Sequence, residues 1–280
     1  MAHVVSPEAE ALLDQEIRVL DHGFVRLVDY LGGDERIVQA ARVSYGAGTK
    51  SVRQDRGLIQ YLMKHHHTSP FEQVVLTFHV KLPIFVARQW IRHRTARLNE
   101  VSARYSVMSD EFYLPASEDI RYQSTDNKQG RSAAEVPAAL QERVLELLQR
   151  GQAEAYRSYE GLIGDDVARE LARVNLPLSL YTQWYWQIDL HNLFHFLKLR
   201  LDAHAQLEIR RYAEALSTLS RAVAPLAHEA FEEHVLHAGQ FSRSELAALR
   251  VMLSGEPNPL DGKARDELEA KLAGPRPSEG

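Results

Sequence analysis

The sequence predicts an α+β fold, with a central, mostly antiparallel sheet flanked by helices, and not a Rossmann fold. Segments that alternate in the period-2 manner of half-buried strands are interleaved with segments of helical periodicity. The order of these segments does not follow the regular strand–helix–strand spacing of a doubly wound parallel sheet. No GxGxxG fingerprint follows any strand-like segment, so a dinucleotide-binding turn of the Rossmann type is not expected.

The N-terminal half supplies two of the expected strands and three of the expected helices. A Gly-Gly turn follows the first strand, Pro70 closes the second helix, and Pro83 suits the first turn of the third. The second strand is rich in β-branched and aromatic residues. We therefore expect strands over residues 24–31 and 72–82, helices over 35–43 and 53–64, and a third helix from Pro83 that carries Phe85, Arg88, Gln89 and Arg92.

The C-terminal half begins with a polar stretch without periodicity, residues 106–132, which indicates a long surface loop of the kind that often serves as a lid. The segments that follow predict a long helix over 135–162, an aromatic-rich strand over 178–188, and helices over 189–201 and 208–224. Prolines interrupt the last forty or so residues. We expect one domain over 1–240 and a C-terminal helical tail of unknown role over 241–280.

Composition excludes several classes of protein. The 280 residues include no cysteine, which excludes disulfides, thiolate metal sites, iron–sulfur clusters and a cysteine nucleophile. The net charge of −5 does not favour nucleic acid as a partner. Apolar runs fall short of the roughly 20 residues that a membrane span needs, and the N-terminus lacks the pattern of a signal peptide. We expect a cytoplasmic protein without a membrane partner.

Positive charge is concentrated in one segment of this acidic chain. Residues 88–104 hold five arginines, one glutamate and no lysine: Arg88, Arg92, Arg94, Arg97, Glu100 and Arg104. A guanidinium group binds phosphate or carboxylate bidentately, whereas an ammonium group acts as a point charge, so the cluster predicts shaped recognition of an anion. A solvated basic face is the alternative. The glycine-rich residues 46–51 break the spacing of a P-loop, so side chains are expected to hold any nucleotide.

The string RHRTARLNEVSARY, residues 92–105, resembles the signature of flavin-dependent thymidylate synthases, RHR-x7-S within RHRxxSxNExSxRY. It departs from that signature at Arg97, where serine is usual, and at Ala103, where glycine is common. Four further segments resemble the same family in the same order: ARVSYG from Ala41, LMKHHHTSPFEQ from Leu62, FHVKLPIFVARQWIRHR up to Arg94, and LRLDAHAQLEIRRY from Leu199. The resemblance covers about residues 20–235 and leaves the tail from Phe241 without a counterpart.

The resemblance implies the reductive methylation of dUMP to dTMP. The carbon donor would be 5,10-methylenetetrahydrofolate and the hydride donor reduced FAD, regenerated by NADPH. The usual alternative chemistry adds a cysteine thiolate to the pyrimidine, and this chain has no cysteine, which agrees with the flavin route. The resemblance also implies a homotetramer with shared active sites.

The resemblance also assigns roles to individual residues. The catalytic residues would be Arg200, expected near the pyrimidine, and His67, expected near the flavin; a structural histidine is the alternative for His67. The dUMP-binding residues would be Gln89, Trp90, Ile91, Arg92, Glu100, Val101, Ser102, Ala103, Arg104, Arg173 and Arg200. The FAD-binding residues would be Ser69, Arg92, His93, Arg94, Glu100, Asp189, Leu190, His191 and His195. Ser102 is assigned to ligand binding because the local sequence offers no base to activate it as a nucleophile.

Two other classes of function remain open on sequence grounds. A metal-dependent hydrolase could use His191, His195 and Asp202, which share one helix face, although no HExxH motif is present and no metal is expected. An RNA-binding module could use the arginines together with the aromatic residues 181–186 as stacking surfaces. The arginine cluster would surround a metal ion with repelling charge, and the net acidity and the absence of a known RNA-binding string count against the RNA-binding module.

Overall fold

The computed structural model describes residues 5–43, 52–125 and 130–273, and the glycine-rich residues 46–51 lie outside them. The chain divides into two compact units, Met1–Phe231 and Glu232–Gly280. The first unit is built on a five-stranded sheet of order β1-β2-β3-β7-β4 in which every neighbouring pair is antiparallel. Its strands are β1 (Glu16–Val19), β2 (Gly23–Leu31), β3 (Val75–Pro83), β4 (Arg97–Glu100) and β7 (Tyr181–Asp189). The predicted α+β class is confirmed.

Strand β7 is central to the placement of the site. It pairs with β3 over its whole length, from Val75 opposite Asp189 to Pro83 opposite Tyr181. On its other side it pairs with β4, so that Arg97 lies opposite Gln187 and Glu100 opposite Trp184. The arginine-rich segment is thereby fixed along the edge of the sheet.

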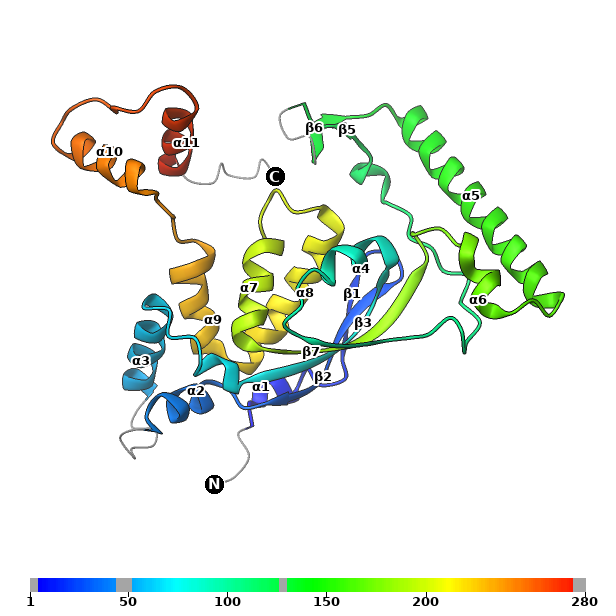
Figure 1. Cartoon of the computed structure of the whole chain (residues 1–280), viewed down its shortest axis with the longest axis horizontal. Helices are drawn as coiled ribbons and strands as arrows, with labels where there is room; N and C mark the ends of the chain where they lie inside the picture. Colours follow the sequence, from blue (N-terminus) through cyan, green and yellow to red (C-terminus); the bar gives the residue numbers. More distant parts are fainter. Residues whose placement is uncertain (1–4, 44–51, 126–129, 274–280) are drawn as a thin grey trace. The chain divides into compact units, whose positions relative to one another are not determined.

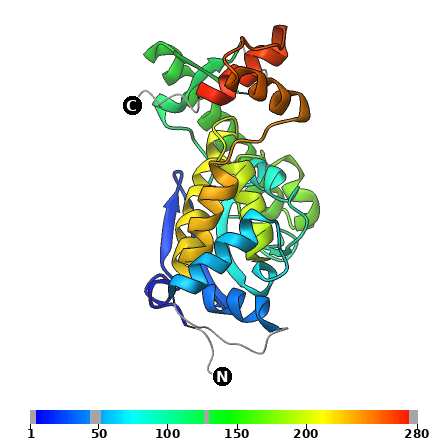
Figure 2. The same cartoon turned by 90° about the vertical axis from the view of Figure 1, so that its left-hand side faces the viewer.

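Helices cover the sheet and carry the remaining site residues. Helix α8 packs against β1 and β2, α7 against β7 and α8, and α9 against α3 and α8 (Figures 1 and 2). The helices of the first unit are α1 (Pro7–Glu10), α2 (Asp34–Ala41), α3 (Val52–Lys64), α4 (Ile84–Trp90), α5 (Ala138–Gly164), α6 (Arg169–Ala172), α7 (Leu190–Arg200), α8 (Leu207–Val223) and α9 (Pro225–Phe231). Short 3₁₀ turns are η2 (Phe71–Gln73), η3 (Ser117–Asp119) and η4 (Arg173–Asn175).

The core lies between the sheet and these helices. Alternate residues of β3 and β7 are buried, which gives each strand one apolar face. The centre of the core is aromatic: Trp90 of α4 contacts Trp184 and Trp186 of β7, Phe196 of α7 and Tyr212 of α8. Through these contacts, Trp90 anchors the end of α4 to the sheet and to helices α7 and α8.

The predicted strands 24–31, 72–82 and 178–188 and the predicted helices all correspond to observed elements, with three differences. Strands β1 and β4 were not expected. The polar residues 106–132, expected to be a loop, contain η3 and the hairpin of β5 (Arg121–Gln123) and β6 (Arg131–Glu135), which continues beyond them. Helix α4 ends at Trp90, before Arg92, because the amides of Arg92 and His93 bond three residues back and tighten the last turn.

The second unit contains a π-helical turn (Glu232–Leu236), α10 (Arg243–Leu253) and α11 (Gly262–Ala273). A capping box at Ser242 and Glu245 starts α10, and Lys271 of α11 pairs with Glu245 at 2.6 Å. The expected tail, residues 241–280, lies within this unit. Among the helices of the described ranges, none is long and apolar enough to cross a membrane.

Candidate active site

Arg200, His93 and Gln89 come together although they are far apart in the sequence. Arg200 is the last residue of α7, Gln89 lies in the last turn of α4, and His93 follows that helix. The Arg200 Nε donates to His93 Nε2 at 3.1 Å, and one terminal nitrogen of Arg200 donates to the Gln89 carbonyl at 3.4 Å. Three expected ligand residues therefore form one contact group, which we call the Arg200 cluster.

The environment of His93 fixes its protonation state. Burial, the Arg200 charge and the neighbouring His195 together lower the pKa of His93 from 6.5 to about 4. The imidazole is therefore neutral at pH 7, and since its Nε2 accepts from Arg200, its proton lies on Nδ1. Burial also lowers the pKa of Arg200, but a guanidinium stays charged at neutral pH.

The start of α7 holds the other expected flavin residues. Asp189 caps this helix: one carboxylate oxygen accepts from the Asn192 amide at 2.9 Å and the other from the Asn192 side chain at 2.7 Å. The exposed His195 ring lies 5.9 Å from the His93 ring, between centroids, so the middle of α7 lies beside the Arg200 cluster. His191 is half-buried, and the Leu190 side chain is fully buried in the core.

Two hydrogen bonds hold Glu100 and Val101 against β7. Thr182 Oγ1 donates to a Glu100 carboxylate oxygen at 2.6 Å, and the Val101 amide donates to the Gln183 carbonyl at 2.9 Å. A turn follows, in which the Ser102 carbonyl accepts from the amides of Tyr105 and Ser106. This register positions the signature segment on the edge of the sheet.

Ser102 has no activating partner among the residues that the structure describes. In residues 5–43, 52–125 and 130–273, no histidine, lysine or carboxylate hydrogen-bonds to its hydroxyl, which accepts from the Arg104 amide at 3.4 Å. A serine without a base is a poor nucleophile. The geometry therefore does not favour Ser102 as a nucleophile, and its assignment to ligand binding stays a prediction.

The arginines of the signature segment differ in their contacts. Arg97 donates to the Gln187 side chain at 3.3 Å, and Arg104 forms an exposed ion pair with Glu170 at 3.2 Å. Arg92 and Arg94 are exposed and have no hydrogen-bond or ion-pair partner within the described part of the chain. Arg173 is half-buried in η4, directly after α6, the helix to which Glu170 belongs.

Two expected dUMP ligands, Trp90 and Ala103, have buried side chains. Trp90 is fully buried and Ala103 is 8% exposed, so a nucleotide could contact them only through the main chain. Ile91 and Val101, by contrast, are 39% and 42% exposed. The Trp90 side chain packs in the core beneath the site.

His67 and Ser69 lie beyond the end of α3 and are exposed. The His67 ring contacts Tyr61 edge-on, with 5.8 Å between ring centroids. No hydrogen bond, ion pair or ring contact joins either residue to the Arg200 cluster in the segments that the structure describes. Their expected roles at the flavin stay predictions.

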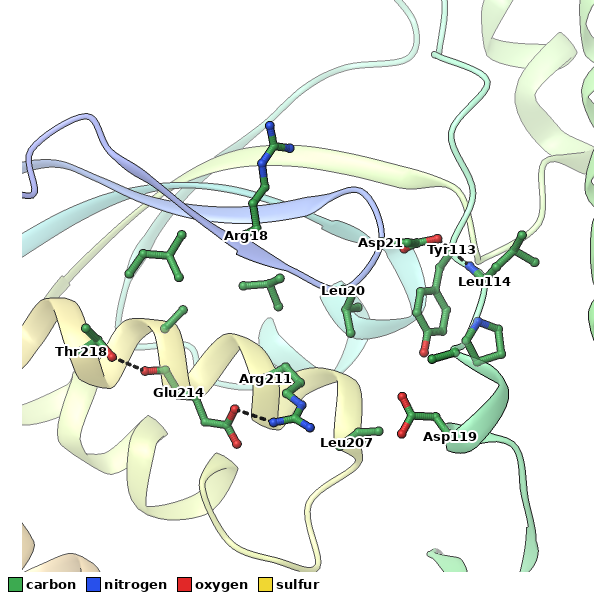
Figure 3. A pocket seen from close by; sticks show the side chains of 15 residues that line it. Arg18, Leu20, Asp21, Tyr113, Leu114, Asp119, Leu207, Arg211, Glu214 and Thr218 are labelled. Carbon is green, nitrogen blue, oxygen red and sulfur yellow. Dashed lines mark hydrogen bonds and ion pairs between the residues drawn. The ribbon is translucent and has the colours of Figure 1, made fainter. Parts of the chain in front are cut away.

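Two cavities lie beside the candidate site rather than in it. One, of about 580 Å³, is lined by the β1–β2 turn with Asp21, the segment that holds Tyr113, and α8 with Arg211 and Glu214 (Figure 3). The other, of about 680 Å³, is lined by the β5–β6 hairpin and residues 203–210. Neither contains an expected ligand residue.

Sequence reasoning missed five residues that support the site: Tyr113, Arg131, Thr182, Gln206 and Glu208. Gln206 and Glu208 lie in the string AHAQLEIRRY, which carried the resemblance without a stated role for either residue. The other three lie in segments without a recognisable motif, and the sequence held no signal for them.

Two family models match the chain. One, described as thymidylate synthase complementing protein, matches residues 26–226, and the other, described as thymidylate synthase ThyX C-terminal domain, matches residues 240–276. The second covers most of the tail that the sequence left without a counterpart.

Curated relatives and solved structures agree with these models. The flavin-dependent thymidylate synthase of Treponema denticola is 60% identical over 260 residues, which cover 93% of this chain and 98% of that protein. That of Treponema pallidum is 58% identical over 272 residues, covering 97% and 89%. The crystal structure of a UMP/dUMP methylase, PolB from Streptomyces cacaoi bound with 5-Br dUMP, has a TM-score of 0.70 at 34% identity and covers 78% of this chain and 97% of that one.

Proposed function

The chain belongs to the flavin-dependent thymidylate synthase family, and on this basis we propose that it methylates dUMP to dTMP. The proposed carbon donor is 5,10-methylenetetrahydrofolate, and NADPH is the proposed source of electrons for the FAD. The similar structure from Streptomyces cacaoi, a UMP/dUMP methylase bound to 5-Br dUMP, supports the choice of nucleotide. The observation that carries the proposal is the Arg200 cluster, which joins residues of two separate segments that carry the resemblance, the one up to Arg94 and the one from Leu199.

The residues present fit a flavin dinucleotide. Arg92 and Arg94 are exposed cations without a carboxylate partner in the described segments, which suits the diphosphate. His93 is neutral and its ring lies beside that of His195, so this part of the site offers aromatic ring surfaces next to the Arg200 charge. When bound and reduced, FAD supplies the hydride that the methylation needs. We propose Ser69, Asp189, Leu190 and His191 as further contacts, and His67 as a catalytic residue near the flavin.

The part that the protein plays is positioning and electrostatics. A guanidinium has five N–H donors, and Arg200 uses two of them on His93 and Gln89. The remaining donors can hold the pyrimidine, and the fixed positive charge stabilises the negative charge that develops on the ring. Arg92, Arg104 and Arg173 are proposed to hold the phosphate, with the main chain of residues 100–103.

Exposed apolar side chains next to the proposed nucleotide ligands support the proposed homotetramer with shared sites. Between residues 91 and 107, Ile91, Leu98, Val101, Tyr105 and Val107 are all exposed, Tyr105 to 78%. Apolar side chains that gather on a surface mark a contact with another protein. A second copy that covers these side chains would approach the nucleotide site directly.

The structure does not favour the two alternatives. Within the described residues no three histidine, aspartate or glutamate side chains are placed to hold a metal ion, and His191, His195 and Asp202 are all described. Trp184 and Trp186 are 1% exposed and cannot stack on RNA bases, which leaves Tyr185 as the exposed aromatic of that group. The cytoplasmic location stays a prediction.

The test is the visible absorption spectrum of the purified protein, followed by anaerobic NADPH oxidation with and without dUMP. We expect a flavin spectrum, oxidation that dUMP stimulates, and dTMP when methylenetetrahydrofolate is added. A protein that neither takes up FAD nor forms dTMP would refute the proposal. FAD binding with no response to dUMP would leave a flavoprotein with a different substrate.

A further inference from the structure

A chain of hydrogen bonds runs from a buried carboxylate to the Arg200 cluster. The Gln206 side-chain amide donates to Glu208 Oε2 at 2.8 Å, and the Gln206 side-chain carbonyl accepts from the side-chain amide of Gln89. Gln89 in turn accepts from Arg200 through its main-chain carbonyl. We call this series the glutamine relay: Glu208, Gln206 and Gln89.

Glu208 is a fixed end for this relay. Its side chain is 1% exposed, and its Oε1 accepts from the Tyr113 hydroxyl at 2.9 Å and from the guanidinium of Arg131. Burial opposes the charge, but Arg131 and the hydrogen bonds hold the pKa of Glu208 below its usual value. Since burial and the Glu208 charge raise the pKa of Tyr113, this hydroxyl stays a donor.

An ionised carboxylate can only accept hydrogen bonds, whereas a glutamine amide can turn over and exchange its donor and acceptor ends. Because Glu208 accepts, Gln206 must present its NH₂ group to Glu208 and its carbonyl to Gln89. Gln89 must then turn its own NH₂ group toward Gln206. Its Oε1, for which no partner exists among the described residues, is left for a ligand.

We infer that Glu208 is a positioning residue that, through Gln206, orients the Gln89 amide so that Gln89 offers an acceptor to the nucleotide. The inference rests on the proposed function, because it takes dUMP as the ligand. The matching group on the nucleotide is a donor, either the pyrimidine N–H or a sugar hydroxyl. A reversed relay would present an NH₂ group to that donor and weaken binding.

Two variants break the relay at different points. Glu208→Gln keeps the size of the side chain but lets the relay reverse. Gln206→Leu removes the middle member, and since Gln206 is exposed, this variant buries no new charge and should fold even where Glu208→Gln does not. Glu214→Gln is the matched control, because Glu214 lies on the same helix in an exposed pair with Arg211.

The measurement is the dissociation constant of dUMP with each FAD-loaded protein, together with FAD content and melting temperature. We expect each relay variant to bind dUMP about five- to tenfold more weakly, the value of one hydrogen bond, with FAD content unchanged. The double variant should bind no more weakly than Gln206→Leu, since both changes interrupt one path.

The outcomes separate the inference from the proposed function. Relay variants that bind dUMP like the wild type, or whose effects simply add, would overturn the inference, as would a lowered melting temperature with unchanged binding. A wild-type protein that binds FAD but no dUMP would overturn the proposed function, and the inference with it.

Discussion

Replacing Arg200 with lysine tests the centre of the proposed site. The substitution keeps the positive charge but loses the planar fork that reaches both His93 Nε2 and the Gln89 carbonyl. A hydrogen bond to a charged group is worth about 1.5–3 kcal/mol. If one such bond to the pyrimidine is lost in the transition state, turnover should fall roughly 10- to 100-fold, at about 1.4 kcal/mol per factor of ten.

The assay is single-turnover dTMP formation with dUMP and methylenetetrahydrofolate, with FAD content measured on the same sample. Arg200→Lys should keep its flavin and lose most of its turnover. Arg210→Lys is the matched control, because Arg210 also donates to a main-chain carbonyl, that of Ala203 at 3.2 Å, but has no proposed ligand. Normal turnover in Arg200→Lys would remove the assigned role of Arg200.

A second measurement on the same position separates charge from shape. The Arg200 charge is one cause of the low pKa of His93. Arg200→Met should therefore raise the pKa of His93, whereas Arg200→Lys should leave it low. An unchanged titration of His93 in Arg200→Met would contradict the geometry of the cluster.

Three further predictions concern pH and packing. The pKa of His93 is lowered from 6.5 to about 4, so the unfolded state binds a proton more readily than the folded state. The free energy of unfolding should therefore fall as the pH drops through this window, and titration of the His93 ring by NMR measures the pKa on which this depends. Burial raises the pKa of Asp34 from 3.8 to about 6, so the free energy of unfolding should instead fall, by up to about 3 kcal/mol, as the pH rises through that window. Denaturant unfolding of the wild type and of Asp34→Asn below and above this window measures the change. A wild-type protein that loses no more stability than Asp34→Asn would contradict the prediction. A Cβ at Gly23 would lie 2.1 Å from the Tyr212 hydroxyl and 2.6 Å from a main-chain oxygen, so Gly23→Ala should cost more than about 1–3 kcal/mol. Gly151→Ala, in open space on a helix, should stabilise by about 0.5–1 kcal/mol, and equal melting temperatures for the two would refute the packing argument.

The long strands that bury one face were predictable from the sequence, whereas the four-residue strands β1 and β4 were missed. In β3 and β7 buried and exposed positions alternate, and the same alternation is visible in the residue types. All four residues of β4 are exposed, and Arg97-Leu98-Asn99-Glu100 carries no such pattern. Its extended form comes from pairing with β7, which is a tertiary effect that local sequence does not encode.

The candidate site was accessible through resemblance but not through local patterns. Arg200 and His93 are 107 residues apart, and no periodicity brings them together. Trp90, expected among the dUMP ligands, has its side chain in the core, so that only its main chain could contact a nucleotide. The sequence pattern around Glu208 is that of an ordinary charged helix residue. Only its burial and its contacts in the structure distinguish it from an exposed glutamate.

The aromatic core also determines what optical spectroscopy can report. The chain has three tryptophans, and all three lie in one cluster, where Trp90 is 5.6 Å from Trp184 and 5.1 Å from Trp186 between ring centroids. Indole fluorescence from this protein therefore has a single origin, beneath the segment proposed to hold the flavin. Residues 232–280 contain no tryptophan, so they contribute no indole signal that could report their unfolding. A fluorescence melt would follow the sheet and its helices, and following the C-terminal unit would require a label of its own.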